Sequence, residues 1–540
     1  MDKLQSAMGS MEVKDLGDRP SSRSSGCSIV LEEFEDLVSV NLKPKFKEKY
    51  PAKPHAQLVA QKLRVKSGLI YLPGLREESY EDSDMPVHWR QRRYFYYMSG
   101  INFPGSVVTY DIHRDSLYAW IPPPNTGSLV IFNGQVPSIK EVKAEYDFDD
   151  VRYITTLGDY LTKFVHYNQR DKIYQLHHYQ TPKNVAREAI LIDGRRSYLR
   201  EFPFEFTKLK PAMNAARAIK DPYEIRMIRK ANAISAEAHI NVLKGIRYFD
   251  NEAEIEAIFM ATCVSEQAKE QPYGIIAGSG PNASILHYVA NNEPLKGRQL
   301  VCLDAGAEWK CYASDVTRTF PISGQFSSEA KEIYDLVAEM QETCIAMIKP
   351  GVDFGTIVIN AVKVAIEGLV KLCLLQNGSS EELLLSGAWR AFFPHGLGHH
   401  VGLEVHDVGD GSDRLNLLSG QKSVNPWISA YLKEDLDPIM STGTTLLPNM
   451  VITIEPGIYF SRYALEDLFL KDTRYAKFIN KDLLDKYYPI GGVRIEDDIL
   501  VTEDGYENLT TAPKGDEALK IINEYKETIA EKKQKKGWLW

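Results

Sequence analysis

Two aspartates, Asp304 and Asp315, lie eleven residues apart in the segment LVCLDAGAEWKCYASDVTRTFP. If the segment is a hairpin with a four-residue turn at 308–311, the two residues are direct partners, because the turn centre lies midway between them. Paired carboxylates with Cβ atoms about 5 Å apart repel each other, so one stays protonated unless a cation lies between them. The spacing therefore predicts a metal site. The alternative is two unrelated aspartates at strand ends, since aspartate is common at turns.

A second segment, HGLGHHVGLEVHDVG, holds four of the twelve histidines of the chain within twelve residues: His395, His399, His400 and His406. A single histidine is usually a structural group, whereas four among glycines are more typical of a metal or catalytic site. The glycines permit close approach of the backbone to a ligand. The segment therefore predicts imidazole side chains at the same site.

Two further segments contribute carboxylates. Glu455 follows VITI (451–454), which we expect to be a buried strand, and a carboxylate at the end of such a strand needs a partner. In GGVRIEDDILVT, alternation predicts that Arg494, Glu496 and Asp498 share one face of a strand. An ion pair with Arg494 would explain Glu496 taken alone. Together the two segments add acidic ligands to the candidate site.

A fifth segment, YGIIAGSGPNASILHY, ends near His287 and contains a GSG loop. It has neither a GxGxxG motif nor a Walker lysine, so it does not predict nucleotide binding.

Two aspartates, two glutamates and a histidine around two divalent cations would form a co-catalytic site with a bridging hydroxide. A shell of oxygens with one nitrogen favours Mn²⁺ over copper, with Zn²⁺, Co²⁺ and Fe²⁺ as alternatives and calcium as a poorer fit.

The elements that must hold these residues fall into two predicted domains. Residues 1–45 are polar and predict a flexible tail, 46–208 predict a mixed α/β domain, 209–525 predict a second domain, and 526–540 predict a charged tail. Short β-type runs bounded by glycine, proline or aspartate occur in the first domain at 63–74, 92–100, 106–112, 117–122 and 128–134.

A strong helix start opens the second domain. Asp221 can cap the helix, Pro222 suits its first position, and Glu224 completes a capping box. Apolar residues then recur every three or four positions as far as Val242, which predicts one long amphipathic helix.

Composition limits the classes of function. The 540 residues carry 64 Lys and Arg against 73 Asp and Glu, a net charge of −9, which argues against a nucleic-acid binder. No apolar run approaches about 18 residues, so no membrane span is predicted. The N-terminal residues lack an apolar signal region, and six cysteines are too few for a disulfide scaffold. These features predict a cytoplasmic protein with reduced thiols.

The combined motifs resemble those of the pita-bread metallopeptidases, specifically the aminopeptidase P and prolidase branch. The stretch RYFYYMSGINFPGS in the first domain is similar to the creatinase-like N-terminal domain of that branch. The resemblance implies an α/β (α+β) architecture, in which a C-terminal pita-bread catalytic domain follows a mixed α/β N-terminal domain. It also implies a proline-specific metalloprotease that forms a homo-oligomer, either a dimer or a tetramer.

The resemblance implies a role for each candidate ligand. Asp304 would bind one metal ion through both oxygens, Asp315 and Glu496 would bridge two ions, His399 would be the sole nitrogen ligand, and Glu455 would be the remaining carboxylate. We expect the two divalent ions to be Mn²⁺. They would lower the pKa of a shared water, and Glu455 would act as general base and then as general acid.

Four more residues match positions around the substrate. His287, His395 and His406 match the histidines of the family that are not ligands, and His406 or His395 would stabilise the oxyanion that develops on the carbonyl. Arg494 matches an arginine that orients Glu496.

The choice between two proline peptidases depends on how the proline carboxylate is bound. Prolidases, which cut dipeptides, carry an arginine shortly before the EPG motif, whereas residues 424–454 contain none, and Arg414 and Lys433 remain as candidates. The long insert between EPG and GGVRIEDD is similar to that of eukaryotic prolidases, but LHYVANNEPLKGRQLVCLDAG has the spacing of aminopeptidase P. We therefore predict an Xaa-Pro aminopeptidase acting on peptides with proline in second position, and a prolidase is the alternative.

Another class of function is a pita-bread domain that has lost its metals and serves as a binding module. A metal-free creatine-type hydrolase on the same fold is a related hypothesis. Both predict broken ligand positions, and all five positions are intact here, so both are disfavoured.

Overall fold

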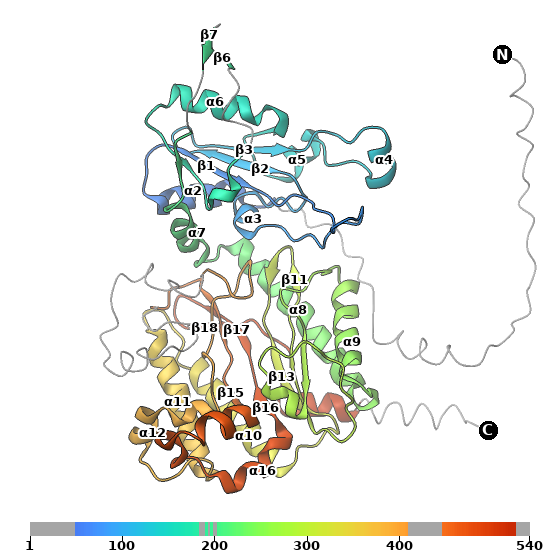
Figure 1. Cartoon of the computed structure of the whole chain (residues 1–540), viewed down its shortest axis with the longest axis vertical. Coiled ribbons are helices and arrows are strands. Elements are labelled where there is room, and N and C mark those ends of the chain that lie inside the picture. The colour runs from blue at the N-terminus through green and yellow to red at the C-terminus, as the bar shows by residue number, and fades with distance from the viewer. Residues whose placement is uncertain (1–48, 183–189, 193–194, 198–201, 409–444, 525–540) are drawn as a thin grey trace, which may run out of the picture. The chain divides into compact units, whose positions relative to one another are not determined.

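The structure is a computed structural model that describes residues 49–182, 190–192, 195–197, 202–408 and 445–524 (Figure 1). The predicted tails at 1–45 and 526–540 lie outside these residues, as do Arg414 and Lys433. Among the described helices, none combines the length and the apolar composition that crossing a membrane requires.

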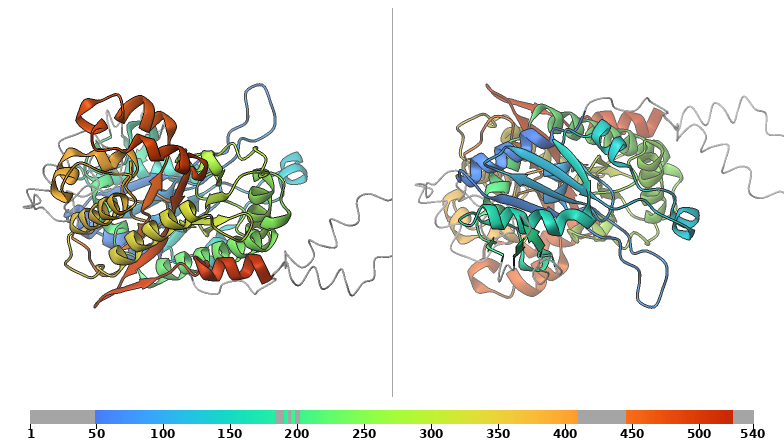
Figure 2. Two further views of the ribbon diagram at one scale, coloured as in Figure 1. Left: turned by 90° about the horizontal axis from the view of Figure 1, so that it is seen from below. Right: turned by 90° about the horizontal axis from the view of Figure 1, so that it is seen from above.

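The elements of the first part of the chain are α2 (Ala52–Leu63), β1 (Leu69–Pro73), α3 (Arg93–Ser99), β2 (Val107–Asp111), β3 (Ser116–Ile121), α4 (Ser128–Asn133), α5 (Ile139–Glu145), β4 (Asp150–Tyr153), α6 (Leu157–Tyr167), β5 (Ile173–Tyr174), β6 (Ile190–Ile192), β7 (Arg195–Ser197), β8 (Phe204–Glu205) and α7 (Leu209–Arg217). Six strands form one sheet in the order β4-β3-β2-β1-β5-β8. Its faces follow the two-residue period of a strand: Leu69 and Tyr71 pack with α6, whereas Ile70 and Leu72 pack with α2, α3 and α7. The view from above in Figure 2 shows α6 lying against this sheet.

Two of the five predicted β-type runs are wrong, because both fold as helices. Residues 92–100 contain α3, and Gly100 ends this helix with a left-handed φ of 68°. Its aromatic residues favour strands, but burial against the sheet overrides that preference. Residues 128–134 contain α4, where Ile131 and Phe132 are 83% exposed and no residue is buried.

The second part of the chain contains α8 (Pro222–Gly245), α9 (Glu252–Ser265), β9 (Ile276–Ser279), β10 (Leu300–Asp304), β11 (Glu308–Trp309), β12 (Tyr312–Ala313), β13 (Thr317–Pro321), α10 (Ser328–Ile345), α11 (Phe354–Lys371), α12 (Ser380–Ser386), β14 (Val451–Ile454), β15 (Gly457–Tyr459), α15 (Thr473–Ala476), α16 (Leu484–Tyr487), β16 (Gly492–Arg494), β17 (Asp497–Val501) and β18 (Tyr506–Asn508). Its strands form the sheets β13-β10-β9 and β14-β17-β18 and the pair β15-β16. α8 and α9 share a core with β9 and β10, whereas α10 and α11 pack with β14, β15 and β16.

The predicted start of the long helix is confirmed. The Asp221 side chain accepts a hydrogen bond from the N–H of Glu224, and the Glu224 side chain accepts one from the N–H of Asp221. The buried strand expected at 451–454 is also present, as β14.

The predicted register of the aspartate hairpin is wrong by two residues, because the turn centre lies one residue later than expected. Its turn consists of Lys310 and Cys311, whose left-handed φ values of 49° and 66° allow a tight two-residue turn. Asp304 is therefore paired with Thr317 and not with Asp315, which lies between β12 and β13.

The predicted continuous strand through Arg494, Glu496 and Asp498 is wrong as well. It is divided into β16, which pairs with β15, and β17, which pairs with β14. Glu496 lies in the break, and its N–H donates to the carbonyl of Thr317 at 3.1 Å. The break therefore brings Glu496 to the hairpin that carries the aspartates.

A buried histidine of α2 joins the start of α8. His55 Nδ1 lies 2.7 Å from the carbonyl oxygen of Tyr97, Nε2 lies 3.0 Å from Asp221 Oδ2, and Glu224 Oε2 lies 3.9 Å from Nε2. Both ring nitrogens face acceptors, as the imidazolium form requires. Burial by itself would lower the pKa of His55, but the hydrogen bond to Asp221 and the charge of Glu224 outweigh it and raise the pKa.

We expect the charged pairing of His55 to stabilise the fold at acid pH and to be lost at alkaline pH. The pKa of His55 is higher in the folded state than in the unfolded state. The pairing therefore contributes fully to stability below the unfolded pKa of about 6.5, and this contribution disappears as the pH rises through the folded pKa. The difference in Tm between the wild type and His55→Gln should therefore be larger at about pH 6 than at about pH 9. The control is His113→Gln, at an exposed histidine. A difference that stays constant over this range would contradict the pairing.

Candidate metal centre

A cavity of about 410 Å³ is lined by all nine residues to which the resemblance assigns a role, whereas His400 and Asp498 are not among its lining residues. Among its lining residues are Asp304, Asp315, His399, Glu455, Glu496, His287, His395, His406 and Arg494. His287 and His406 are exposed, whereas His399 and Glu496 are buried. Tyr273, which the sequence did not predict, also lines the cavity.

The acidic residues form two overlapping groups with the spacing of metal ligands. Asp304, Asp315 and Glu496 each place an oxygen within 4.8 Å of the others, and Glu455, Glu496 and a ring nitrogen of His399 do the same. His399 Nε2 also lies 3.3 Å from Asp315 Oδ2 and 3.3 Å from Glu455 Oε1. Since Glu496 belongs to both groups, the five residues form one continuous cluster.

These carboxylates carry more negative charge than the neighbouring side chains neutralise. Burial raises the pKa of Asp304 to about 6, because the charge of Arg494 offsets only part of the effect and the charge of Asp315 adds to it. Burial and the charges of Asp315 and Glu455 raise the pKa of Glu496. Asp304 Oδ1 and Glu496 Oε1 are buried without a hydrogen-bond partner. Bound cations would satisfy both atoms and neutralise the charge, so the donor set fits two divalent ions.

His399 presents the ring nitrogen that a metal ligand needs. Its Nδ1 lies 3.1 Å from the carbonyl of His400 and donates to it in the neutral ring, which leaves Nε2 facing the carboxylates. The backbone of His399 is held by β14, because its N–H donates to Thr453 Oγ1 at 3.0 Å. A Cβ on the adjacent Gly398 would lie 2.0 Å from the carbonyl oxygen of Thr453, so this close approach requires glycine.

Arg494 binds the cluster through all three of its guanidinium nitrogens. Nη2 donates to Asp304 Oδ2 at 2.7 Å, Nη1 to the hydroxyl of Tyr459 at 2.9 Å, and Nε to Thr317 Oγ1 at 3.1 Å. Thr317 in turn donates to Glu496 Oε2 at 2.6 Å. The direct carboxylate partner of Arg494 is therefore Asp304, and its link to Glu496 passes through Thr317.

The chain is similar to known metallopeptidases over nearly all of its length. The family model described as metallopeptidase family M24 matches residues 226–503, and the model of the aminopeptidase P N-terminal domain matches residues 53–174. A probable Xaa-Pro aminopeptidase of Botryotinia fuckeliana is 56% identical over 99% of this chain and 100% of the relative. The chain belongs to metallopeptidase family M24. The family predicted from the motifs is thus confirmed, and membership implies divalent metal ions.

Other relatives of this M24 chain point to the same branch. A probable Xaa-Pro aminopeptidase of Aspergillus niger is 51% identical over 88% of this chain and 93% of the relative. The structure of Escherichia coli aminopeptidase P with the inhibitor Pro-Leu matches with a TM-score of 0.70 and 26% identity, over 89% of this chain and 100% of that one. Pseudomonas aeruginosa aminopeptidase PepP matches with a TM-score of 0.69 and 28% identity, over 89% and 99%. The predicted α/β architecture with a C-terminal pita-bread domain is confirmed.

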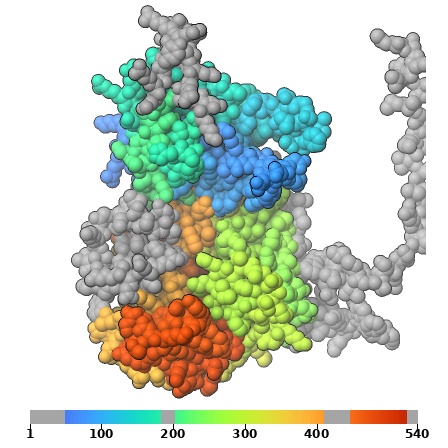
Figure 3. Space-filling view, viewed as in Figure 1, coloured from blue at the N-terminus to red at the C-terminus, as the bar shows by residue number. Residues whose placement is uncertain are grey.

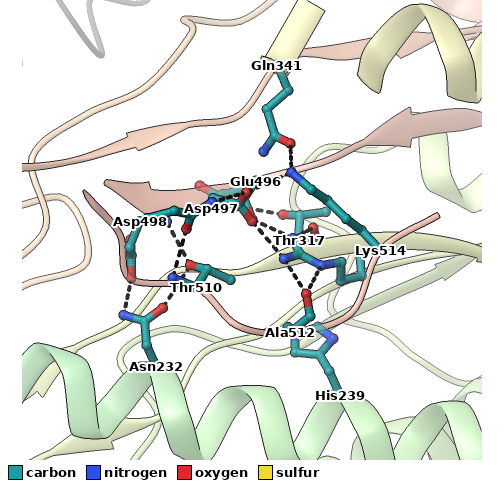
Figure 4. Close-up of polar contacts among 12 residues, drawn as sticks. Asn232, His239, Thr317, Gln341, Glu496, Asp497, Asp498, Thr510, Ala512 and Lys514 are labelled. Atoms are coloured by element: carbon teal, nitrogen blue, oxygen red, sulfur yellow. Dashed lines mark hydrogen bonds and ion pairs between the residues drawn. The ribbon is translucent and has the colours of Figure 1, made fainter. Parts of the chain in front are cut away.

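Buried polar contacts of β17 adjoin Glu496 of the cluster in this M24 protein, and Figure 4 shows those of Asp498 with Asn232 and Thr510. Asp498 Oδ2 accepts from Asn232 of α8 at 2.7 Å and from the backbone N–H of Asp315 at 3.0 Å. The N–H of Asp498 donates to Thr510 Oγ1 at 2.9 Å. Burial and the charge of Asp315 raise the pKa of Asp498 to about 8. The strand that follows Glu496 thereby holds the backbone of Asp315 as well.

Thr317 and Tyr459 are site residues of the M24 chain that sequence reasoning missed. The Tyr459 hydroxyl joins Arg494 to His395, whose Nε2 lies 2.8 Å away. Their spacing from Asp315 and Glu455 gave no signal, because neither acidic residue lies in the strand, β13 or β15, that carries the hydroxyl group.

Proposed function

We propose that this chain is an Xaa-Pro aminopeptidase, which hydrolyses the bond between an N-terminal residue and a following proline. The observation that carries the proposal is the cluster in one cavity where two ligand groups share Glu496. Relatives named probable Xaa-Pro aminopeptidase, matched over nearly the whole chain, support the substrate class. The proposed partners are therefore peptides with proline in second position.

Asp304, Asp315, His399, Glu455 and Glu496 would hold two divalent ions. The donor set is mostly oxygen with one imidazole, which favours Mn²⁺. When bound, such ions lower the pKa of a shared water into the neutral range and polarise the scissile carbonyl.

The side chains of the cavity supply the proton transfers and the oxyanion contact. Glu455 accepts the proton of the attacking water and returns it to the proline nitrogen as the bond breaks. His395 is oriented through both ring nitrogens, Nδ1 toward the carbonyl of Gly396 at 2.7 Å and Nε2 toward Tyr459 at 2.8 Å. We assign the oxyanion contact to His406, which lines the cavity beside His399 at a distance of 4.3 Å between ring centroids.

The charge of the cavity favours an aminopeptidase over a prolidase. A dipeptidase needs a cation for the free carboxylate of proline. Among the described residues that line the cavity, Arg494 is the one guanidinium or ammonium group, and Asp304 already binds it. The longer peptides cut by an aminopeptidase have no carboxylate at this position.

The test is a hydrolysis assay of the purified chain with Mn²⁺, in which Gly-Pro is compared with Arg-Pro-Pro-Gly. Cleavage of the longer peptide at its first bond is the expected result. Cleavage of the dipeptide alone would identify a prolidase instead. If neither peptide is cut with Mn²⁺, Co²⁺ or Zn²⁺, the proposed activity is wrong.

We also propose a homo-oligomer, a cytoplasmic location and a domain division between residues 208 and 209. The two family models, which match residues 53–174 and 226–503, lie on either side of this division. Free thiols at all five described cysteines are consistent with a reducing compartment. Light scattering of the purified protein, with a dimer or tetramer expected, tests the oligomer.

We expect divalent ions to raise the Tm of the metal-free protein. An ion that binds the folded state alone at about 100 times its Kd adds about 2.7 kcal/mol of stability. Mn²⁺ added after treatment with a chelator should therefore shift the thermal transition upward by several degrees, and Asp315→Asn should reduce the shift because it removes a shared ligand charge. An unchanged Tm in the wild type would contradict the metal site.

A further inference from the structure

The loop that carries His406 is held on its inner side by buried charges. Asp407 accepts from Arg217 and, at 3.2 Å, from Lys220, and all three side chains are buried. The N–H of Asp407 donates to the carbonyl of His400 at 2.9 Å, which closes the loop on itself. These contacts fix the two ends of the loop but not its middle.

The middle of the loop is held from the N-terminal part of the chain. Glu404 receives two hydrogen bonds from Arg90, with Nη2 at 2.8 Å from Oε2 and Nη1 at 3.2 Å from Oε1. Val405, which lines the cavity, separates Glu404 from His406. In Figure 3 the orange segment around residue 400 reaches the surface just below blue residues of the N-terminal part.

Arg90 and the nearby Arg93 also bind the hairpin that carries the two aspartates of the cluster. Glu308 of β11 is buried, and its Oε2 lies 2.5 Å from Arg93 Nη2 and 3.3 Å from Arg90 Nη2. Glu308 lies between Asp304 and Asp315 in the sequence. Arg93, the first residue of α3, and Arg90, three residues before it, thereby bind one glutamate from each of two segments that build the metal centre.

We propose that Arg90 and Glu404 are a positioning pair for the reaction, through which the N-terminal domain sets the place of His406. This inference rests on the proposed function. An arginine that binds a carboxylate through two parallel hydrogen bonds fixes geometry as well as charge. The side chains of Arg90 and Glu404 are 32% and 38% exposed, so the pair adds little to stability. A displacement of about 1 Å at a catalytic group can lower the rate by about 100-fold, so the effect falls on turnover.

The variants Glu404→Gln, Arg90→Gln and the double variant test the pair in the full chain. We expect kcat to fall about tenfold in each, with KM within about twofold and Tm unchanged. The double variant should be no worse than Arg90→Gln, because that single variant already removes the pairing with Glu404. The matched control is Glu270→Gln, which removes the exposed pair of His88 and Glu270 at 2.9 Å and should behave like the wild type.

Hydrogen exchange of the loop measures the positioning without any substrate. The N–H groups of Gly402 and Asp407 bond within the loop, at 3.1 Å to Glu404 and 2.9 Å to His400. Peptides covering 401–408 should exchange several-fold faster in Glu404→Gln and Arg90→Gln than in Glu270→Gln. If the loop of Glu404→Gln and of Arg90→Gln exchanges at the wild-type rate, the inference is overturned, even if the chain cuts no Xaa-Pro peptide. A loss of Tm with unchanged kcat would also overturn it, because the pair would then be structural.

Discussion

Replacing Glu455 by glutamine is expected to lower kcat by about 1,000-fold. The amide cannot accept a proton from water, and it removes one negative charge from the ligand group with His399 and Glu496. In the metal-free protein, burial by itself would raise the pKa of Glu455, but the hydrogen bond and charge of a protonated His399 lower it. The measurement is steady-state hydrolysis of an Xaa-Pro peptide at saturating Mn²⁺, with bound metal determined on the same samples.

The metal content decides how the loss is interpreted. If Glu455→Gln keeps two ions and still loses activity, the missing proton transfer is the cause; if it holds fewer ions, the ligand role contributes. Glu503→Gln, at an exposed glutamate, is the control. A Glu455→Gln variant with activity within about tenfold of wild type would exclude Glu455 as the general base.

Replacing Arg494 by methionine is expected to destabilise the chain by about 3–5 kcal/mol, because it leaves a buried carboxylate without its cation. The guanidinium nitrogens bind Asp304, Tyr459 and Thr317 in three directions. Arg494→Lys keeps the charge but cannot reach all three acceptors, so an intermediate loss is expected. The midpoint of urea unfolding, measured on metal-free protein, reports the difference.

Added metal should recover part of the stability lost in Arg494→Met, since a divalent ion also neutralises Asp304. The control is Arg462→Met, which breaks an exposed pair with Glu466 at 2.7 Å and should cost at most about 1 kcal/mol. Equal midpoints for the variants at 462 and 494 would show that Asp304 does not depend on its arginine.

Residue types and caps were predictable from the sequence, whereas strand register was not. The capping box at Asp221 depends on neighbours in the chain, so it could be recognised directly. The hairpin register depends on two residues with left-handed φ, Lys310 and Cys311, neither of which is a glycine or asparagine that would signal the turn. The break at Glu496 likewise follows from pairing with β14 and β15, which no local pattern contains.

The residues of the site were predictable from the sequence, because metal binding requires particular residue types. Their exact positions in the strand pairing were not, because several pairings can bring the same residues together. Asp304 and Asp315 lie in one cluster even though they are not direct partners across the hairpin. Thr317 and Tyr459 escaped prediction because a hydroxyl that joins two charged groups leaves no distinctive spacing. Both are apparent only when Arg494 is placed between them.

The arginines at and just before the start of α3 also limit how the chain can be rearranged. Arg90 and Arg93 form ion pairs with Glu308 and Glu404. A catalytic half expressed alone would therefore carry two more carboxylates without a cation, next to a metal centre that is already acidic. A chimera with the N-terminal half of a relative would function only if that half supplied equivalent arginines. Exchange of one half therefore requires matching charges on the other half at these contacts.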